Sequence, residues 1–108
     1  MHKIVKPFVF DDIAELDAKC IQTIIAEGEI SIKDWAFALK GYKEDVQSEI
    51  FAKLADVNET LAERIYDEMV DIGLIYASEA VKAQNYIAGV IDRLQKTGGV
   101  FVPVNEDA

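Results

Sequence analysis

The side chains that could carry out catalysis are few and scattered along this chain. Adjacent carboxylates occur at Asp11-Asp12 and at Asp67-Glu68, and paired carboxylates are common groups for general acid and base catalysis. Neighbouring residues on a helix point about 100° apart. The two members of each pair therefore do not converge on one substrate atom, and neither pair predicts a hydrolytic site.

The other reactive residue types are nearly absent. His2 is the one histidine and lies at the N-terminus, so a histidine-dependent triad or a zinc site lacks its other members. Cys20 is the one cysteine, and we expect it to be a small core residue in a reducing compartment. Gly98-Gly99 follows a predicted helix, whereas a phosphate-binding loop precedes one. We therefore expect a protein that is not an enzyme and needs no metal or other cofactor.

The charge balance narrows the classes of partner. The 108 residues include 11 Lys and Arg against 20 Asp and Glu, a formal net charge of −9. This balance argues against binding to a nucleic-acid backbone and against docking on an anionic membrane face, and it favours basic partners. The length suits one domain. No uninterrupted apolar run approaches the roughly 18 residues of a membrane span, and the first residues lack the apolar region of a signal peptide.

Capping residues and glycines divide the sequence into six predicted helices. Asp11 and Asp17 are expected N-caps of a helix of one to two turns and of a helix over about 18–27. The later helices are expected from Ser31 to Gly41, from about Glu44 to Leu54, from Asn58 to about Ile72, and from Ser78 to about Lys96. Six helices with short connections indicate an all-α domain, followed by an extended tail over 100–104 that packs on the bundle.

The fifth predicted helix has the clearest two-sided pattern. Its apolar side is expected to contain Leu61, Ile65, Met69 and Ile72, extended by Ala62, Tyr66 and Val70. The opposite arc contains Glu63, Arg64, Asp67, Glu68 and Asp71, with Arg64 within reach of Asp67 and Glu68. Two interpretations of that arc stand: a solvated face that keeps the protein soluble, or a docking ridge for a basic partner.

The sixth predicted helix has an apolar stripe and several small residues. The stripe is formed by Ala80, Ala83, Ile87, Ile91 and Leu94. The small residues Ala83, Ala88 and Gly89 are expected to allow close approach of a neighbouring helix.

An ordered set of short motifs resembles the C-terminal domain of the bacterial flagellar motor switch protein FliG. The set begins with Phe8-Val9-Phe10-Asp11-Asp12-Ile13, similar to the family's Met-Phe-x-Phe hinge, and continues with Leu16-Asp17, Ile21-Gln22, Ala38-Leu39-Lys40-Gly41, Asp67-Glu68 with Gly73, and Ala83-Gln84. It covers about residues 7–104. The resemblance implies a compact, armadillo-like, right-handed domain of six helices over 11–104, a hinge segment over 1–10 and an acidic tail over 105–108.

The resemblance also implies which residues contact a partner. Lys40 matches the lysine of the family's Ala-Leu-Lys-Gly motif, and Asp67 and Glu68 match an acidic pair on its torque helix. Arg64 lies one turn from that pair and is a candidate replacement for a lost base. Phe8 and Phe10 match the two aromatic positions of the hinge.

Several positions depart from the family's pattern. Three basic positions of the family fall at Tyr66, at Tyr76 and near Asp56 in this chain, so none of them carries a base. The proline of the family's Gly-Pro turn is Leu74 here. Pro7 stands where the hinge has Met, which stiffens that segment.

The implied function is that of a non-catalytic rotor component of the flagellar motor switch. In this reading the domain lies at the cytoplasmic face of the inner membrane, and its charged residues contact the cytoplasmic loop of a MotA-like stator protein for torque and switching. The other implied partners are FliM-like switch proteins and neighbouring rotor subunits, with no nucleic acid and no membrane insertion.

Two alternatives stay open: a FliG-like paralogue without torque function, or a stand-alone acidic helical adaptor. A charge-driven rotor contact weakens steeply with salt, whereas an adaptor that binds through an apolar groove tolerates salt.

Overall fold

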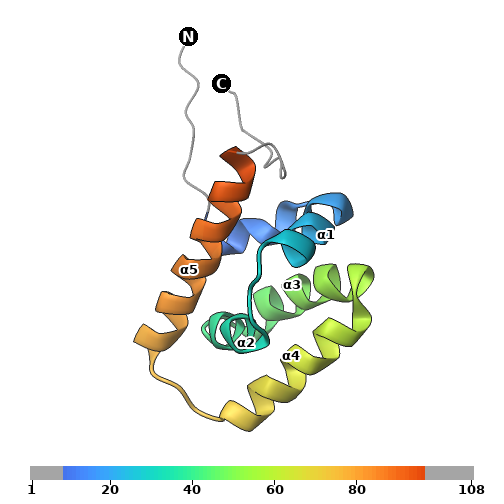
Figure 1. The fold of residues 1–108 in the computed structure, drawn as a ribbon. Helices are drawn as coiled ribbons and strands as arrows, with labels where there is room; N and C mark the ends of the chain where they lie inside the picture. Colours follow the sequence, from blue (N-terminus) through green and yellow to red (C-terminus); the bar gives the residue numbers. More distant parts are fainter. Residues whose placement is uncertain (1–8, 97–108) are drawn as a thin grey trace.

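The computed structural model describes residues 9–96, which form an all-α domain (Figure 1). Its elements are the 3-10 helix η1 (Phe10–Glu15) and the α-helices α1 (Ala18–Glu27), α2 (Ile32–Lys40), α3 (Glu44–Val57), α4 (Glu59–Ile72) and α5 (Ala77–Lys96). The prediction of six helices is confirmed, although α3 runs three residues past its predicted end at Leu54. Phe8, the extended tail over 100–104 and the acidic tail over 105–108 lie outside the described residues.

Three predicted N-caps are present with their hydrogen bonds. The side chains of Asp17, Ser31 and Asn58 accept from the backbone N–H of Cys20, Asp34 and Leu61 at 2.9, 3.0 and 3.0 Å. The bonds from the Cys20 N–H and side chain hold the pKa of Asp17 below its ordinary value. Short polar side chains satisfy otherwise unpaired N–H groups at a helix start, so these starts are set locally.

Two predicted caps are wrong: Val9 and Tyr76 precede the two helices, and an acid three residues further on accepts from the N–H of each. The first helix begins at Phe10, and Asp12, not Asp11, accepts from the Val9 N–H at 3.1 Å. Helix α5 begins at Ala77, so the predicted cap Ser78 lies inside its first turn. There the Glu79 carboxylate accepts from the Tyr76 N–H at 3.0 Å, the carboxylate half of a capping box.

Helix α2 lies at the centre of the domain, between α5 on one side and α4 on the other (Figure 1). Helix α3 packs against α4, α1 and η1. The core has contributions from all six elements, and its fully buried large side chains are Trp35, Ile13, Leu16, Ile21, Ile24, Leu39, Ile50, Leu54, Ile65, Ile87 and Ile91. Cys20 is buried in this core, as predicted.

Phe10 fixes the start of the described chain to the centre of the domain. Its ring is buried, stacks on Tyr42 with centroids 5.5 Å apart, and is tilted against Trp35 at 6.1 Å. The Tyr42 hydroxyl donates to Asp11, and burial together with this bond raises the pKa of Tyr42 above its ordinary value. Residue Phe10 of the proposed hinge is therefore also a core residue.

The close helix approach predicted at Gly89 is wrong, and Gly41 has that role instead. Gly89 is exposed, and a Cβ placed on it would have no neighbour within 4 Å. A Cβ on Gly41 would lie 2.7 Å from the Cβ of Ala80 and 2.4 Å from Nε2 of Gln84. The missing side chain of Gly41 thus lets the end of α2 pack directly on α5. The predicted stripe of α5 is confirmed, with Leu94 only partly buried.

Candidate interaction surface

The outer face of α4 carries a row of acids that is not interrupted by a base. Glu59, Glu63, Asp67 and Asp71 follow one another at intervals of four residues, and all four are exposed. Residues four apart are neighbours along a helix, and each like-charged pair at this spacing destabilises a helix by roughly 0.2–0.5 kcal/mol. The row therefore does not serve the stability of α4 itself.

Asp67 and Glu68, the predicted acidic contact pair, differ in exposure. Asp67 lies in the exposed row, whereas Glu68 is half-buried. Successive residues of an α-helix are about 100° apart, so the two carboxylates point in different directions. Asp67 is the member that faces solvent beside other acids.

Arg64 is exposed on the same helix and forms no ion pair with its predicted partners. Within residues 9–96, no ion pair joins Arg64 to Asp67 or Glu68. An ion pair in this part of the chain joins Lys96 to Asp92 on α5, at 3.2 Å. The guanidinium of Arg64 is accordingly available to an external group.

Lys40 is not part of this exposed face. Its side chain is half-buried at the end of α2, and its Nζ donates to the backbone carbonyl of Met69 at 3.0 Å. Met69 belongs to the last turn of α4, whose carbonyls lack partners within the helix. A positive charge also interacts favourably with the negative end of the helix dipole. The lysine therefore joins α2 to the C-terminal end of α4.

Exposed apolar side chains border the acidic row, and the sequence pattern did not identify them as exposed. Tyr66 and Val70 were expected on the buried side, yet they are 60% and 65% exposed. Leu74 is fully exposed, and Tyr76 is 79% exposed in the connection to α5. Tyr66 and Val70 lie about 100° and 140° around the helix from the buried Ile65. We call Tyr66, Val70, Leu74 and Tyr76 the apolar strip.

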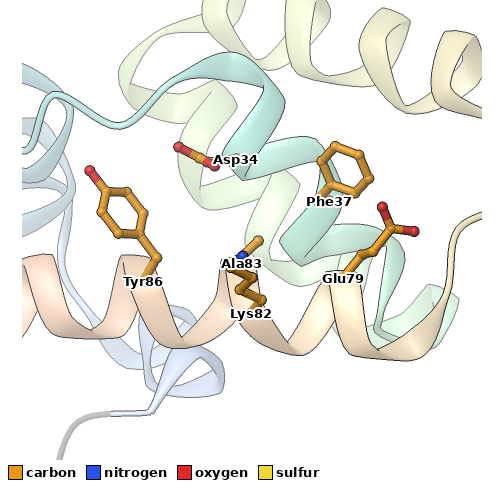
Figure 2. Close-up of a pocket in the computed structure, with 6 residues that line it drawn as sticks. All are labelled: Asp34, Phe37, Glu79, Lys82, Ala83 and Tyr86. Atoms are coloured by element: carbon orange, nitrogen blue, oxygen red, sulfur yellow. The ribbon is translucent and has the colours of Figure 1, made fainter.

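A separate groove of about 400 Å³ lies between α2 and α5. Figure 2 shows Phe37 and Asp34 reaching into it from α2, opposite Glu79, Ala83 and Tyr86 of α5. Lys82 also lines it. Its lining combines the aromatic rings of Phe37 and Tyr86 with three charged side chains, Asp34, Glu79 and Lys82. The sequence pattern gave no indication of this groove, because its two walls are more than 40 residues apart in the chain. They meet only through the packing of α2 on α5.

The described residues do not group into a metal site or a membrane-spanning element. Between residues 9 and 96, no three His, Cys, Asp or Glu side chains are placed to hold a metal ion. No helix in that range is long and apolar enough to cross a membrane.

Comparison with known families decides the class of the domain. The sequence model of the FliG C-terminal domain matches residues 4–102. The chain belongs to this family. It is the domain of a flagellar motor switch component, and family membership confirms the prediction that the chain is not an enzyme.

Relatives of this FliG C-terminal domain occur in several bacteria. The flagellar motor switch protein FliG of Thermotoga maritima is 30% identical over 95 residues, and those of Pseudomonas aeruginosa and Bacillus subtilis are 29% and 27% identical over 95 residues. Each alignment covers 88% of this chain and 27% of the relative. The chain thus spans about a quarter of the length of these relatives.

A solved structure supports the fold. The crystal structure of FliG residues 86–343 from H. pylori superposes with a TM-score of 0.71 and 27% sequence identity, covering 86% of this chain and 42% of that one. The all-α fold class predicted from the sequence is therefore confirmed.

Proposed function

We propose that this domain is the stator-contacting part of a flagellar rotor, and that the exposed face of α4 makes the contact. The observation that carries the proposal is the acidic row of Glu59, Glu63, Asp67 and Asp71, exposed and without a base among its members. Such a row attracts a basic partner over a distance of about a Debye length, roughly 8–10 Å at physiological salt. Opposite charges across an interface steer encounter and set register.

The partner in this proposal is the cytoplasmic loop of a MotA-like stator protein, met at the cytoplasmic face of the inner membrane. FliM-like switch proteins and neighbouring rotor subunits are the other proposed partners. Asp67 and Arg64 are the exposed contact residues, with Glu68 at the edge of the surface. Lys40 contributes chiefly by positioning α4, because its Nζ is bound to the Met69 carbonyl.

Reversal of both acids, Asp67→Lys with Glu68→Lys, tests the stator contact. In the full-length protein expressed in its own host, we expect smaller swimming colonies and fewer stator units at the motor, because the reversed charges repel a basic loop. The melting temperature is expected to stay nearly unchanged, since both side chains lie outside the core.

The matched control is Glu27→Lys with Glu49→Lys, the same charge change at exposed positions of α1 and α3. Normal motility of the control with reduced motility of the α4 variant supports the proposal. Normal swimming of the Asp67→Lys, Glu68→Lys variant would overturn it.

A second candidate is a FliG-like domain that has kept the scaffold without generating torque. The observation in its favour is that Tyr66 and Tyr76, both exposed, occupy positions where the family carries bases. In that case a strain with this protein as its single FliG recruits stators to the motor but does not rotate its flagella. Rotation of tethered cells distinguishes the two candidates.

A further inference from the structure

The apolar strip and the acidic row lie next to each other on α4 and in the turn that follows it. Of the seven large apolar side chains that are exposed within residues 9–96, the four of the strip, Tyr66, Val70, Leu74 and Tyr76, fall in this short stretch. Apolar side chains that gather on a surface and are rimmed by polar groups mark interaction sites more often than singly scattered ones do. The connection between α4 and α5 also lies at one end of the domain, far from α1 and η1 (Figure 1).

Two local features place the strip: the packing of Tyr66 on α3 and the turn at Gly73. Tyr66 packs edge-on against Phe51 of α3, with ring centroids 6.3 Å apart. Gly73 ends α4 with a φ of 70°, a left-handed conformation that favours glycine. The turn at Gly73 places Leu74 outside the helix, where no part of residues 9–96 covers it. Because the backbone of α4 and of the turn is already folded, binding there costs less ordering entropy than binding by an unfolded segment.

The charges beside the strip indicate which kind of partner can bind there. Glu63, Asp67 and Asp71 are exposed next to Tyr66 and Val70 on the same helix, and the whole chain has a net charge of −9. A second copy of the chain would bring the same acids against them, and like charges in contact disfavour an interface. An anionic membrane is repelled for the same reason. A cationic partner with apolar side chains satisfies both halves of the surface.

We propose that the strip and the acidic row form one amphipathic docking surface for a basic amphipathic helix of the stator. The partner helix lays its aliphatic side chains on Tyr66, Val70 and Leu74, while its Lys or Arg side chains pair with Glu63, Asp67 and Asp71. The spacing of Tyr66 and Val70, one helical turn apart, matches the repeat of apolar residues on such a helix. This inference rests on the proposed stator contact and adds to it an apolar component that salt does not screen.

Val70→Ser with Leu74→Ser removes the apolar component and leaves every charge in place. Solubilised stator complexes are bound to the immobilised full chain at low salt and at roughly 0.3 M NaCl. We expect the variant to bind on the order of tenfold more weakly at both salt concentrations, because buried apolar side chains dominate interface affinity. The control is Val81→Ser, an exposed valine of α5 outside the strip, which is expected to bind like the parent chain. Circular dichroism establishes that all variants stay folded.

The second probe is a synthetic amphipathic helix with Leu on one face and Lys on the other. Because it is not a stator protein, it tests this inference separately from the proposed function. If the synthetic helix binds the parent but not the Val70→Ser, Leu74→Ser variant, the result supports an amphipathic docking surface. If the stator complex binds neither protein, that result refutes the stator contact alone. Measurable and equal binding of the synthetic helix to the parent and to this variant would overturn the inference, since the contact would then be purely ionic.

Discussion

Lys40 illustrates how one side chain can match a family motif and still act inside the fold. Its Nζ reaches across from α2 to the Met69 carbonyl, 29 residues further along the chain, at a distance of 3.0 Å. A comparable bond joins Lys53 of α3 to the carbonyl of Leu16 at 2.7 Å. In both cases an ammonium group satisfies a carbonyl that has no partner in its own helix or turn. A motility effect of a Lys40 variant therefore has to be compared with its effect on stability.

Lys40→Met keeps the aliphatic stem and removes the hydrogen bond to Met69. We expect the free energy of unfolding to fall by about 1 kcal/mol, the usual net contribution of one such bond. Urea denaturation followed by circular dichroism measures this change. Lys33→Met is the control, because Lys33 lies on the same helix and is exposed, so its replacement is expected to alter stability by less than about 0.5 kcal/mol. Equal midpoints for the two variants would refute the structural role of Lys40.

At the scale of elements, the motifs that resemble FliG meet at the C-terminal end of α2. The Ala38 carbonyl accepts from the side chain of Gln84 at 3.0 Å, and the Leu39 carbonyl accepts from Gln47 at 2.9 Å. Gly41 provides the space that brings α5 this close. Ala38-Leu39-Lys40-Gly41 and Ala83-Gln84 are thus the two sides of one helix contact. The two hydrogen bonds hold the end of α2 to α3 and to α5.

Replacement of glycine by alanine at two positions tests this contact. Gly41→Ala would place a Cβ 2.7 Å from that of Ala80, and such overpacking destabilises by typically 1–3 kcal/mol, so we expect a loss of roughly that size. Gly89→Ala places its Cβ in open space on α5, where alanine favours the helix by roughly 0.5–1 kcal/mol. Thermal unfolding of the two variants is expected to shift in opposite directions. A destabilised Gly89→Ala or a stabilised Gly41→Ala would contradict the described packing.

At the scale of the whole molecule, the excess of acids opposes folding. The net charge of −9 brings like charges together in the compact state. The ion pair between Lys96 and Asp92 is exposed, so it contributes at most a few tenths of a kcal/mol. Burial of the apolar core around α2 must therefore supply the stability of the domain.

The melting temperature of the chain is expected to rise with salt. Increasing NaCl to roughly 0.3 M shortens the Debye length and screens the repulsion among the carboxylates. Differential scanning calorimetry at several salt concentrations measures the slope. Glu63→Gln with Asp67→Asn interrupts the acidic row and is expected to show a smaller slope than the parent. A melting temperature that falls with salt would mean that ion pairs, not repulsion, dominate the electrostatics.

The sequence by itself determined the features that depend on neighbouring residues. The starts of α1, α2 and α4 follow from Asp17, Ser31 and Asn58, because each side chain bonds to a backbone N–H three residues ahead. The acidic face of α4 follows from helical periodicity alone. These features depend on local interactions. The ordered short motifs along the chain were sufficient to indicate the family.

The tertiary structure decided which sides of the helices are covered. Tyr66 and Val70 are exposed because α4 packs on α2 and α3 at one edge of the domain, which leaves its buried face narrower than the apolar pattern indicated. Lys40 meets the Met69 carbonyl, and Gly41 instead of Gly89 forms the close contact, for a similar reason. Periodicity defines the direction of each side chain around its own helix axis. Only the packing of helices distant in sequence determines what that side chain meets.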